Sequence, residues 1–245
     1  MKRDATNGST TTLFRKALCS GIILAASLCS LDSTAGVTVP YEDKGSITRS
    51  CTSFPSCRSV ETSHNAANQS TGVTSTPIST TNAYYIFDLT GLSGSVSSAT
   101  FELAITDIPS FSQGKSVGIF DVMTHLAFFS TTGSETRSNL GGGTIGPIEQ
   151  VLNDLGSGQQ YASFSLSSLG TLSVGLNALT DLNAAIGGHF ILGLTGLTTL
   201  GTSFGDGSLT LNGVAAIPEP ETYAMLVAGL GILGLVARRR RQQAT

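Results

Sequence analysis

The stretch YYIFDLTGLSGSVSSATFELAI, residues 84–105, decides the fold class of this chain. Near its end Phe101, Leu103 and Ile105 alternate with Glu102, so the apolar side chains share one face of an extended segment. The beginning of the stretch lies in a second extended segment, 82–89, which is rich in aromatic residues. The sequence therefore predicts two β-strands here.

The residues between these strands are typical of a turn, because Thr90-Gly91 and Ser93-Gly94 tolerate the backbone angles of a tight reversal. Neighbouring residues on a strand face opposite sides. We therefore expect one ring of the Tyr84-Tyr85 pair in the core and the other pointing outward.

Further short strands are expected on both sides of this stretch, weakly near 37–41 and 46–49, and then at 116–123, 162–166, 172–176, 190–194 and 208–211. Proline in the first turn or glycine just past the end favours short helices at 147–155 and 179–186. Together these signals predict an all-β, antiparallel β-sandwich at 81–216 with one or two short helices. A Ser/Thr-rich part of the body, 36–80, precedes it.

The opening stretch resembles the start of certain secreted jelly-roll modules, in which a strand ending in Phe-Asp-Leu is followed by a turn and a second strand. This resemblance implies a jelly-roll-like sandwich. Some of those modules bind polysaccharide, but the likeness covers two strands and carries over none of their binding residues.

The body of the chain, residues 36–217, is acidic. It has five basic and twelve acidic residues, a net charge of −7, because the other cations lie near the two ends of the chain. An acidic body without a basic patch argues against a nucleic-acid partner.

The C-terminal end has three physically distinct parts. Pro218, Glu219 and Pro220 form a stiff segment that cannot join a helix. Residues 222–237 carry no charge and are expected to form a transmembrane helix, roughly 24 Å long at about 1.5 Å per residue. The cations that follow should stop the segment at the cytoplasmic side: Arg238, Arg239, Arg240 and Arg241. A buried core helix with a basic tail is the alternative.

These three parts in this order, at 217–241, resemble the PEP-CTERM sorting signal, a tail family also known as the ice-binding protein C-terminal domain. The resemblance implies that an exosortase, a membrane-embedded cysteine transpeptidase, recognises Pro218, Glu219 and Pro220 and cleaves near them. Family members typically come from Gram-negative bacteria that make extracellular polysaccharide. The tail is a sorting address, so it says nothing about ice; the body also shows no regular threonine ladder.

The N-terminal end predicts a secretory signal peptide at 1–35, with signal peptidase cutting after Ala35. A lipoprotein signal that uses Cys29 is the alternative. Together the two ends predict an exported protein that is anchored transiently in the inner membrane by its C-terminus. Its body would be periplasmic, and then at the cell surface or extracellular after processing.

Two cysteines remain in the body, and an oxidising compartment favours a disulfide between Cys51 and Cys57. Free thiols remain an alternative. A zinc site with His64 is another, although the usual paired ligand spacing is missing.

No catalytic constellation stands out in the sequence, so we expect no enzyme activity, no metal and no cofactor. The histidines His64, His125 and His189 are far apart, and the body has no G-x-S-x-G motif. The strand-end aspartates Asp88, Asp107 and Asp121 are read as turn residues, with a structural Ca²⁺ site as the alternative.

The sequence thus predicts a non-catalytic cell-surface or matrix protein that is associated with exopolysaccharide. A polysaccharide-binding module is the alternative, although the chain has no tryptophan to stack on sugar rings. A polysaccharide hydrolase or lyase would need two convergent carboxylates.

Overall fold

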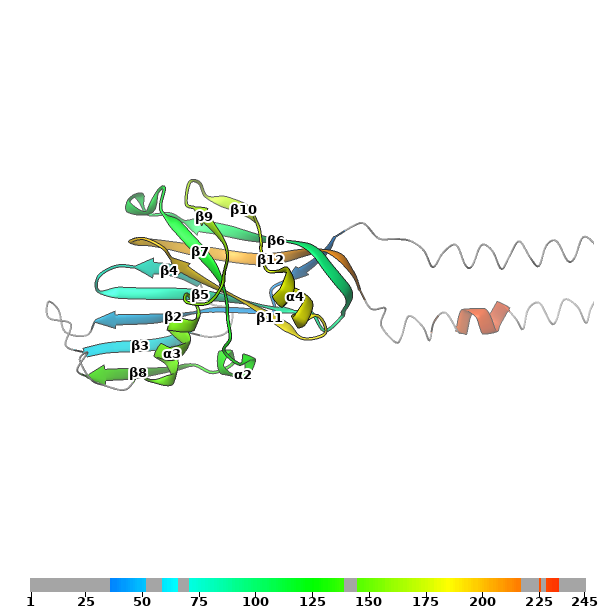
Figure 1. The fold of residues 1–245 in the computed structure, drawn as a ribbon, viewed down its shortest axis with the longest axis horizontal. Coiled ribbons are helices and arrows are strands. Elements are labelled where there is room, and N and C mark those ends of the chain that lie inside the picture. The colour runs from blue at the N-terminus through cyan, green and yellow to red at the C-terminus, as the bar shows by residue number, and fades with distance from the viewer. Residues whose placement is uncertain are drawn as a thin grey trace, which may run out of the picture. The chain divides into compact units, whose positions relative to one another are not determined.

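The computed structural model describes residues 36–51, 59–65, 71–138, 145–216, 225 and 228–233. Within these ranges, twelve strands pair antiparallel throughout, and the helices are short (Figure 1). The predicted all-β, antiparallel fold with short helices is therefore confirmed. The strands are β1 (Val37–Pro40), β2 (Asp43–Cys51), β3 (Ser59–Asn65), β4 (Thr71–Ser75), β5 (Ser79–Asp88), β6 (Leu92–Asp107), β7 (Ser116–Asp121), β8 (Gly133–Ser138), β9 (Gln160–Ser165), β10 (Gly170–Gly175), β11 (His189–Gly196) and β12 (Leu200–Ala216).

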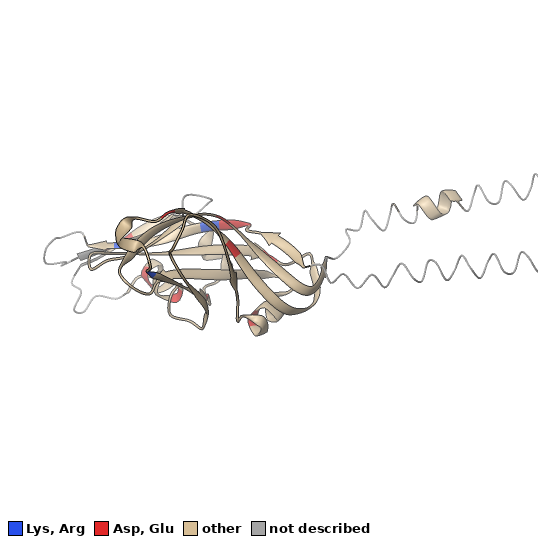
Figure 2. Ribbon diagram, turned by 90° about the horizontal axis from the view of Figure 1, so that it is seen from above, with Lys and Arg blue, Asp and Glu red and all other residues tan. Residues whose placement is uncertain are grey.

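Strand order explains how one continuous sheet makes two layers. The main path runs β10-β6-β12-β4-β5-β11-β7-β9, and β2, β3 and β8 extend it from the other edge of β5. The apolar faces of β6 and β12 share one core with those of β5, β7 and β11, so the sheet folds over on itself. Charged residues are sparse on these strands (Figure 2).

The main core contains the residues that the sequence pattern placed there. Phe101, Leu103 and Ile105 of β6 are buried, whereas Glu102 is exposed. On β5, Tyr85 and Phe87 pack into the same core. The alternation read from the sequence is therefore confirmed for these two strands.

The prediction that one tyrosine of the Tyr84-Tyr85 pair points outward is wrong. The two rings do lie on opposite faces of β5, but both are fully buried. Tyr84 packs into a second apolar cluster with Ile47, Phe129 and Leu152. Helices α2 (Leu126–Phe129) and α3 (Pro147–Asp154) contribute to this cluster and cover the outer face of β5.

The expected helices 147–155 and 179–186 are present as α3 and α4 (Leu179–Ala185), and α2 was missed. Helix α3 sits close to the sheet, because a Cβ atom on Gly193 of β11 would overlap the carbonyl oxygen of Leu155. Glycine at position 193 therefore allows the end of α3 to lie against β11. A 3-10 helix, η1 (Ser110–Ser112), precedes β7.

The predicted turn at Ser93-Gly94 is wrong. Only Thr90 and Gly91 form the turn, and β6 begins at Leu92. Gly94 has a φ of 101° and pairs with Val214 next to a register shift that follows Asn212. Gly94 occupies an irregular position inside a long strand. Its neighbourhood has the residue types of a turn, and the sequence therefore predicted a reversal there.

The Ser/Thr-rich part, 36–80, contributes strands to the same sheet. β1 pairs with β12, β2 pairs with β5, and β4 pairs with both β5 and β12. Residues 36–80 therefore belong to the same sheet as the strands of 81–216.

Several predictions lie outside the described residues. They concern the signal peptide 1–35 with Ala35, Cys57, the triplet Pro218, Glu219 and Pro220, and the arginines 238–241. Residues 225 and 228–233 are helical and exposed. Among the residues that are described, no helix is long and apolar enough to cross a membrane.

Candidate functional site

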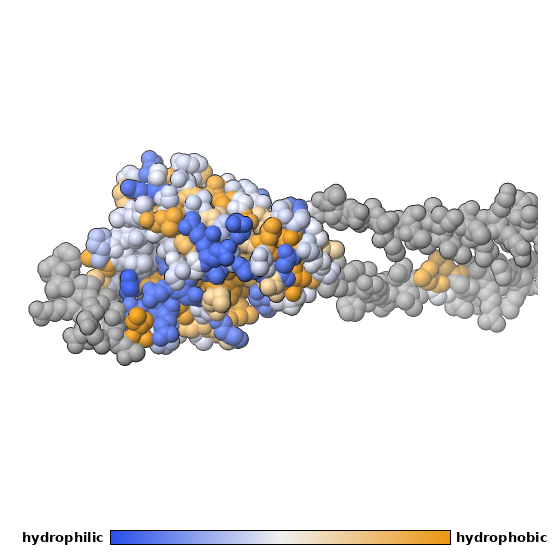
Figure 3. Space-filling model, in the orientation of Figure 1, coloured by the Kyte–Doolittle hydropathy of each residue, from blue (hydrophilic) through white to orange (hydrophobic). Residues whose placement is uncertain are grey.

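A pocket of about 460 Å³ lies where the end of β7, helix α4 and the beginning of β11 meet. Its lining combines carboxylates, imidazoles and a phenol with apolar side chains. Figure 3 shows that hydrophilic and hydrophobic residues alternate in small patches on the face drawn there. The lining residues are Asp121, Val122, Met123, Thr124, His125, Leu126, Tyr161, Asp181, Ala184, Ala185, His189, Phe190 and Ile191.

Two carboxylates give the pocket its chemical character. Asp181 of α4 accepts a hydrogen bond of 2.7 Å from the hydroxyl of Tyr161. The pKa of Tyr161 is raised, mainly by burial and secondly by this hydrogen bond to a carboxylate. Asp121 ends β7, and its Oδ1 is buried without a hydrogen-bond partner among the described residues. Burial raises the pKa of Asp121, the backbone N–H of Gln159 partly opposes this shift, and the nearby Asp181 and Asp154 add to it by repulsion.

The loop after β7 is held in place by Asp154 at the end of α3. Its Oδ2 accepts hydrogen bonds from the backbone N–H of Met123 at 3.0 Å and of Thr124 at 2.8 Å, and from the Thr124 hydroxyl. One wall of the pocket is therefore a loop between β7 and α2 that these hydrogen bonds hold in place.

Two of the three histidines, which look unrelated in the sequence, line this pocket. His189 Nε2 lies 3.1 Å from Glu42 Oε2, and His125 Nδ1 accepts the backbone N–H of Ala127 at the start of α2. Sequence reasoning missed the pocket because Asp121 and Asp181 are sixty positions apart, and only the folded sheet brings them together.

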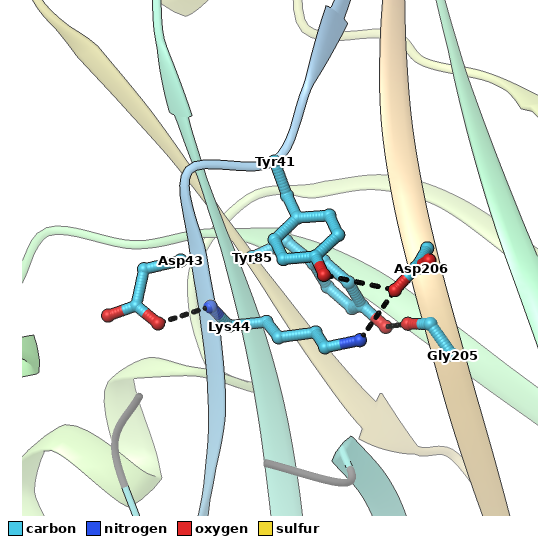
Figure 4. A network of polar contacts seen from close by, with 6 residues as sticks. All are labelled: Tyr41, Asp43, Lys44, Tyr85, Gly205 and Asp206. Atoms are coloured by element: carbon cyan, nitrogen blue, oxygen red, sulfur yellow. Dashed lines mark hydrogen bonds and ion pairs between the residues drawn. The ribbon is translucent and has the colours of Figure 1, made fainter. Parts of the chain in front are cut away.

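Lys44 is buried elsewhere, in a network that joins the beginning of β2 to β12 (Figure 4). Its Nζ lies 3.0 Å from Asp206 Oδ1 and 4.7 Å from the centre of the Tyr41 ring. The Tyr41 hydroxyl donates to the same oxygen, and Tyr85 donates to the Gly205 carbonyl at 2.7 Å. Lys44 and Tyr41 hold the pKa of Asp206 below its usual range.

The strand-end aspartates do not form the alternative Ca²⁺ site. Asp88, Asp107 and Asp121 do end β5, β6 and β7, but Asp88 Oδ1 accepts from the N–H and hydroxyl of Thr90 within its own turn. In the described part of the chain, no three His, Cys, Asp or Glu side chains are grouped so that they could hold a metal ion. Cys51 is disulfide-bonded, and its expected pairing with Cys57 stays a prediction.

The third histidine, His64, fixes α2 to the sheet instead of lining the pocket. It is buried, its Nε2 lies 3.0 Å from the Tyr84 hydroxyl, and its ring stacks on Phe128 at 5.1 Å. Burial lowers the pKa of His64 below 6.5, and the Thr131 backbone and Asp43 partly oppose this shift. The folded protein therefore prefers the neutral ring.

We predict that acid weakens this contact. Above pH 6.5 His64 is neutral in both the folded and unfolded chains; below it the unfolded chain takes up a proton that the folded chain resists. The free energy of unfolding should thus fall as the pH drops below about 6.5. In denaturant titrations from pH 8 to 5, His64→Phe should flatten this fall, and the control His125→Gln should keep it. Equal slopes for wild type and His64→Phe would contradict the prediction.

Comparison with solved structures gives two adhesin domains of Lys-gingipain (Kgp) from Porphyromonas gingivalis W83. The K1 domain is 11% identical, with a TM-score of 0.26, over 63% of this chain and 75% of the other. The K3 domain is 12% identical, with a TM-score of 0.21, over 62% and 74%. These likenesses are too distant to carry an argument about function. No curated protein matches the chain.

The C-terminal residues do match a known family. The match begins at Ala216, the last residue of β12, and ends at Arg241, so it includes the proline triplet, the uncharged segment and the arginines. It confirms the resemblance seen in the sequence. Residues 216–241 are a PEP-CTERM protein-sorting motif.

Proposed function

We propose that this chain is a non-catalytic protein of the cell surface or extracellular matrix, associated with exopolysaccharide. The observation that carries the proposal is the PEP-CTERM motif at 216–241, which indicates export and processing by an exosortase. The β-rich body, proposed to be jelly-roll-like, would be the part that reaches the surface.

The order of events follows from the two ends of the chain. Signal peptidase would cut after Ala35, the segment 222–237 would span the inner membrane, and the arginines 238–241 would remain in the cytoplasm. The body would lie in the periplasm of a Gram-negative cell until an exosortase cleaves near the triplet.

The sequence supports the non-catalytic part of the proposal, because the body has no G-x-S-x-G motif. His64 is buried against aromatic side chains, where it cannot reach a substrate.

The triplet is the first place to test the proposal. In a host that carries an exosortase, replacing Pro218, Glu219 and Pro220 by alanine should leave the full-length chain in the membrane fraction, because the enzyme loses its recognition sequence. Immunoblots of membrane and released fractions measure the result. Glu221→Ala, which removes the next carboxylate, is the matched control and should be processed normally. Normal processing of the triple variant would sink the proposal.

A second candidate function is polysaccharide binding, which the pocket next to α4 favours. It is large enough for a sugar unit and combines hydrogen-bonding groups with apolar walls. Affinity electrophoresis of the body, as cells release it, against a glycan panel tests this function. Unchanged migration in every matrix would count against it.

A further inference from the structure

The pocket next to α4 has negative side chains and no cation of its own. Asp121 and Asp181 line it, and none of its lining residues is a lysine or an arginine. Only the imidazoles His125 and His189 could offer positive charge, and His189 already faces Glu42 at 3.1 Å.

The acidic character continues beyond the pocket. A smaller pocket of about 200 Å³ shares Leu126 with it and is lined by Glu42 and Asp43. The contact between Glu42 and His189 links the linings of the two pockets. Carboxylates thus line two neighbouring pockets that share Leu126.

The described lysine and arginine side chains do not neutralise Asp121 and Asp181, because two of them are paired elsewhere and a third lies far along β7. Lys44 pairs with Asp206, and Arg49 pairs with Glu149 at 3.3 Å. Lys115 directly precedes β7, whereas Asp121 ends it, which places them about 20 Å apart along the strand.

Asp121 has one oxygen atom in an unfavourable environment. Its Oδ1 is buried and lacks a hydrogen-bond partner among the described residues, and Gly158 lies directly against that atom. Burial of this one oxygen without a partner is unfavourable, although the backbone N–H of Gln159 stabilises the carboxylate. Because Oδ1 packs against Gly158, a ligand in the pocket would contact the other oxygen of Asp121.

We propose that this pocket binds a ligand that carries a primary ammonium group, with Asp121 and Asp181 as its carboxylate partners. An ammonium offers three donors and a compact charge, and Asp181 has one oxygen that the Tyr161 bond does not use. Met123 and Leu126 supply apolar surface for the carbon skeleton. The pocket volume suits one amino-sugar unit or a short diamine.

The negative charge of the pocket selects a ligand with an ammonium group. The natural source of this group is either an amino sugar of a deacetylated glycan or a simple polyamine. The inference deepens the second candidate function and rests on it only for the glycan source. An anionic ligand would be repelled by the same carboxylates.

Isothermal titration of the full-length protein in detergent separates these possibilities. The probes are an oligomer of glucosamine, its fully N-acetylated counterpart and putrescine. The glucosamine oligomer should bind, and the N-acetylated oligomer, which has lost its charge, should bind about tenfold more weakly or not at all. Binding of putrescine as well would assign the site to simple amines, and its failure would assign the site to amino sugars.

Asp181→Asn is the deciding variant, because its amide oxygen can still accept the Tyr161 hydroxyl while the charge is lost. It should weaken binding about tenfold, and Asp121→Asn should do the same if the first variant fails to fold. Glu102→Gln is the control, since it removes one exposed charge from β6.

Three outcomes would overturn the inference. They are no binding of either amine, equal binding of the acetylated oligomer, and an equal loss in Glu102→Gln, which would mean general attraction to an acidic body. If the neutral glycan binds equally well to wild type and Asp181→Asn, polysaccharide binding stands and the ammonium site does not.

Discussion

Phe101→Ala should lower the free energy of unfolding by about 3–5 kcal/mol, the usual cost of deleting a buried aromatic ring. Phe101 has no exposed surface, and its ring contacts Tyr85 at 5.5 Å and Phe87 at 6.0 Å between centroids. Gly207 of the neighbouring β12 leaves room for this ring, since a Cβ atom there would lie 3.0 Å from it. The cavity would open between the two layers, where rigid strands on both sides resist collapse.

Denaturant titration measures this loss, and Phe111→Ala is the matched control. Phe111 lies in η1 and exposes 57% of its surface, so the same deletion there should change the stability by less than about 0.5 kcal/mol. Similar losses in the two variants would mean that Phe101 does not lie in the core.

Gly193→Ala should destabilise the protein by about 1–3 kcal/mol, near the upper end of that range. The added Cβ would overlap the carbonyl oxygen of Leu155 and lie 3.0 Å from its carbonyl carbon. These are backbone atoms, so no side-chain rotation relieves the clash. The end of α3 must move away from β11, which would disturb Leu152 and Leu155 in the second cluster.

Gly175→Ala is the control for this substitution. Gly175 ends β10, and a Cβ atom there meets nothing within 4 Å. Its stability should stay within about 0.5 kcal/mol of wild type in the same titration. A mild effect at Gly193 that matches Gly175 would show that α3 is not packed directly on the sheet.

Much of the sheet could be predicted because local pattern and burial agree. On β6 the alternation around Glu102 matches its burial, and Pro147 marks the beginning of α3. Strand lengths could not be predicted in the same way. β12 runs from Leu200 to Ala216, but its glycines hide the pattern outside 208–211.

Local sequence patterns could not predict the second apolar cluster or the pocket. Tyr84 is buried because α2 and α3 return to cover its face, and nothing in its own strand signals that cover. The sequence places Asp121 and Asp181 at the end of a strand and in a short helix, but their approach depends on the order of β7 and β11 in the sheet. Strand order is set by long-range packing, which single-sequence patterns do not carry.

The length of β12 has a mechanical consequence. Its last residue, Ala216, is also the first residue of the sorting motif, so tension on the C-terminal segment enters the body through this strand. β6 pairs with it up to Ala216, and β1 pairs with it at 208–211 on the other edge. A pull along the strand loads these two ladders in shear, so that many hydrogen bonds resist together instead of opening one by one. The body is thus attached through a strand that is paired with β6 and β1 close to the point of attachment.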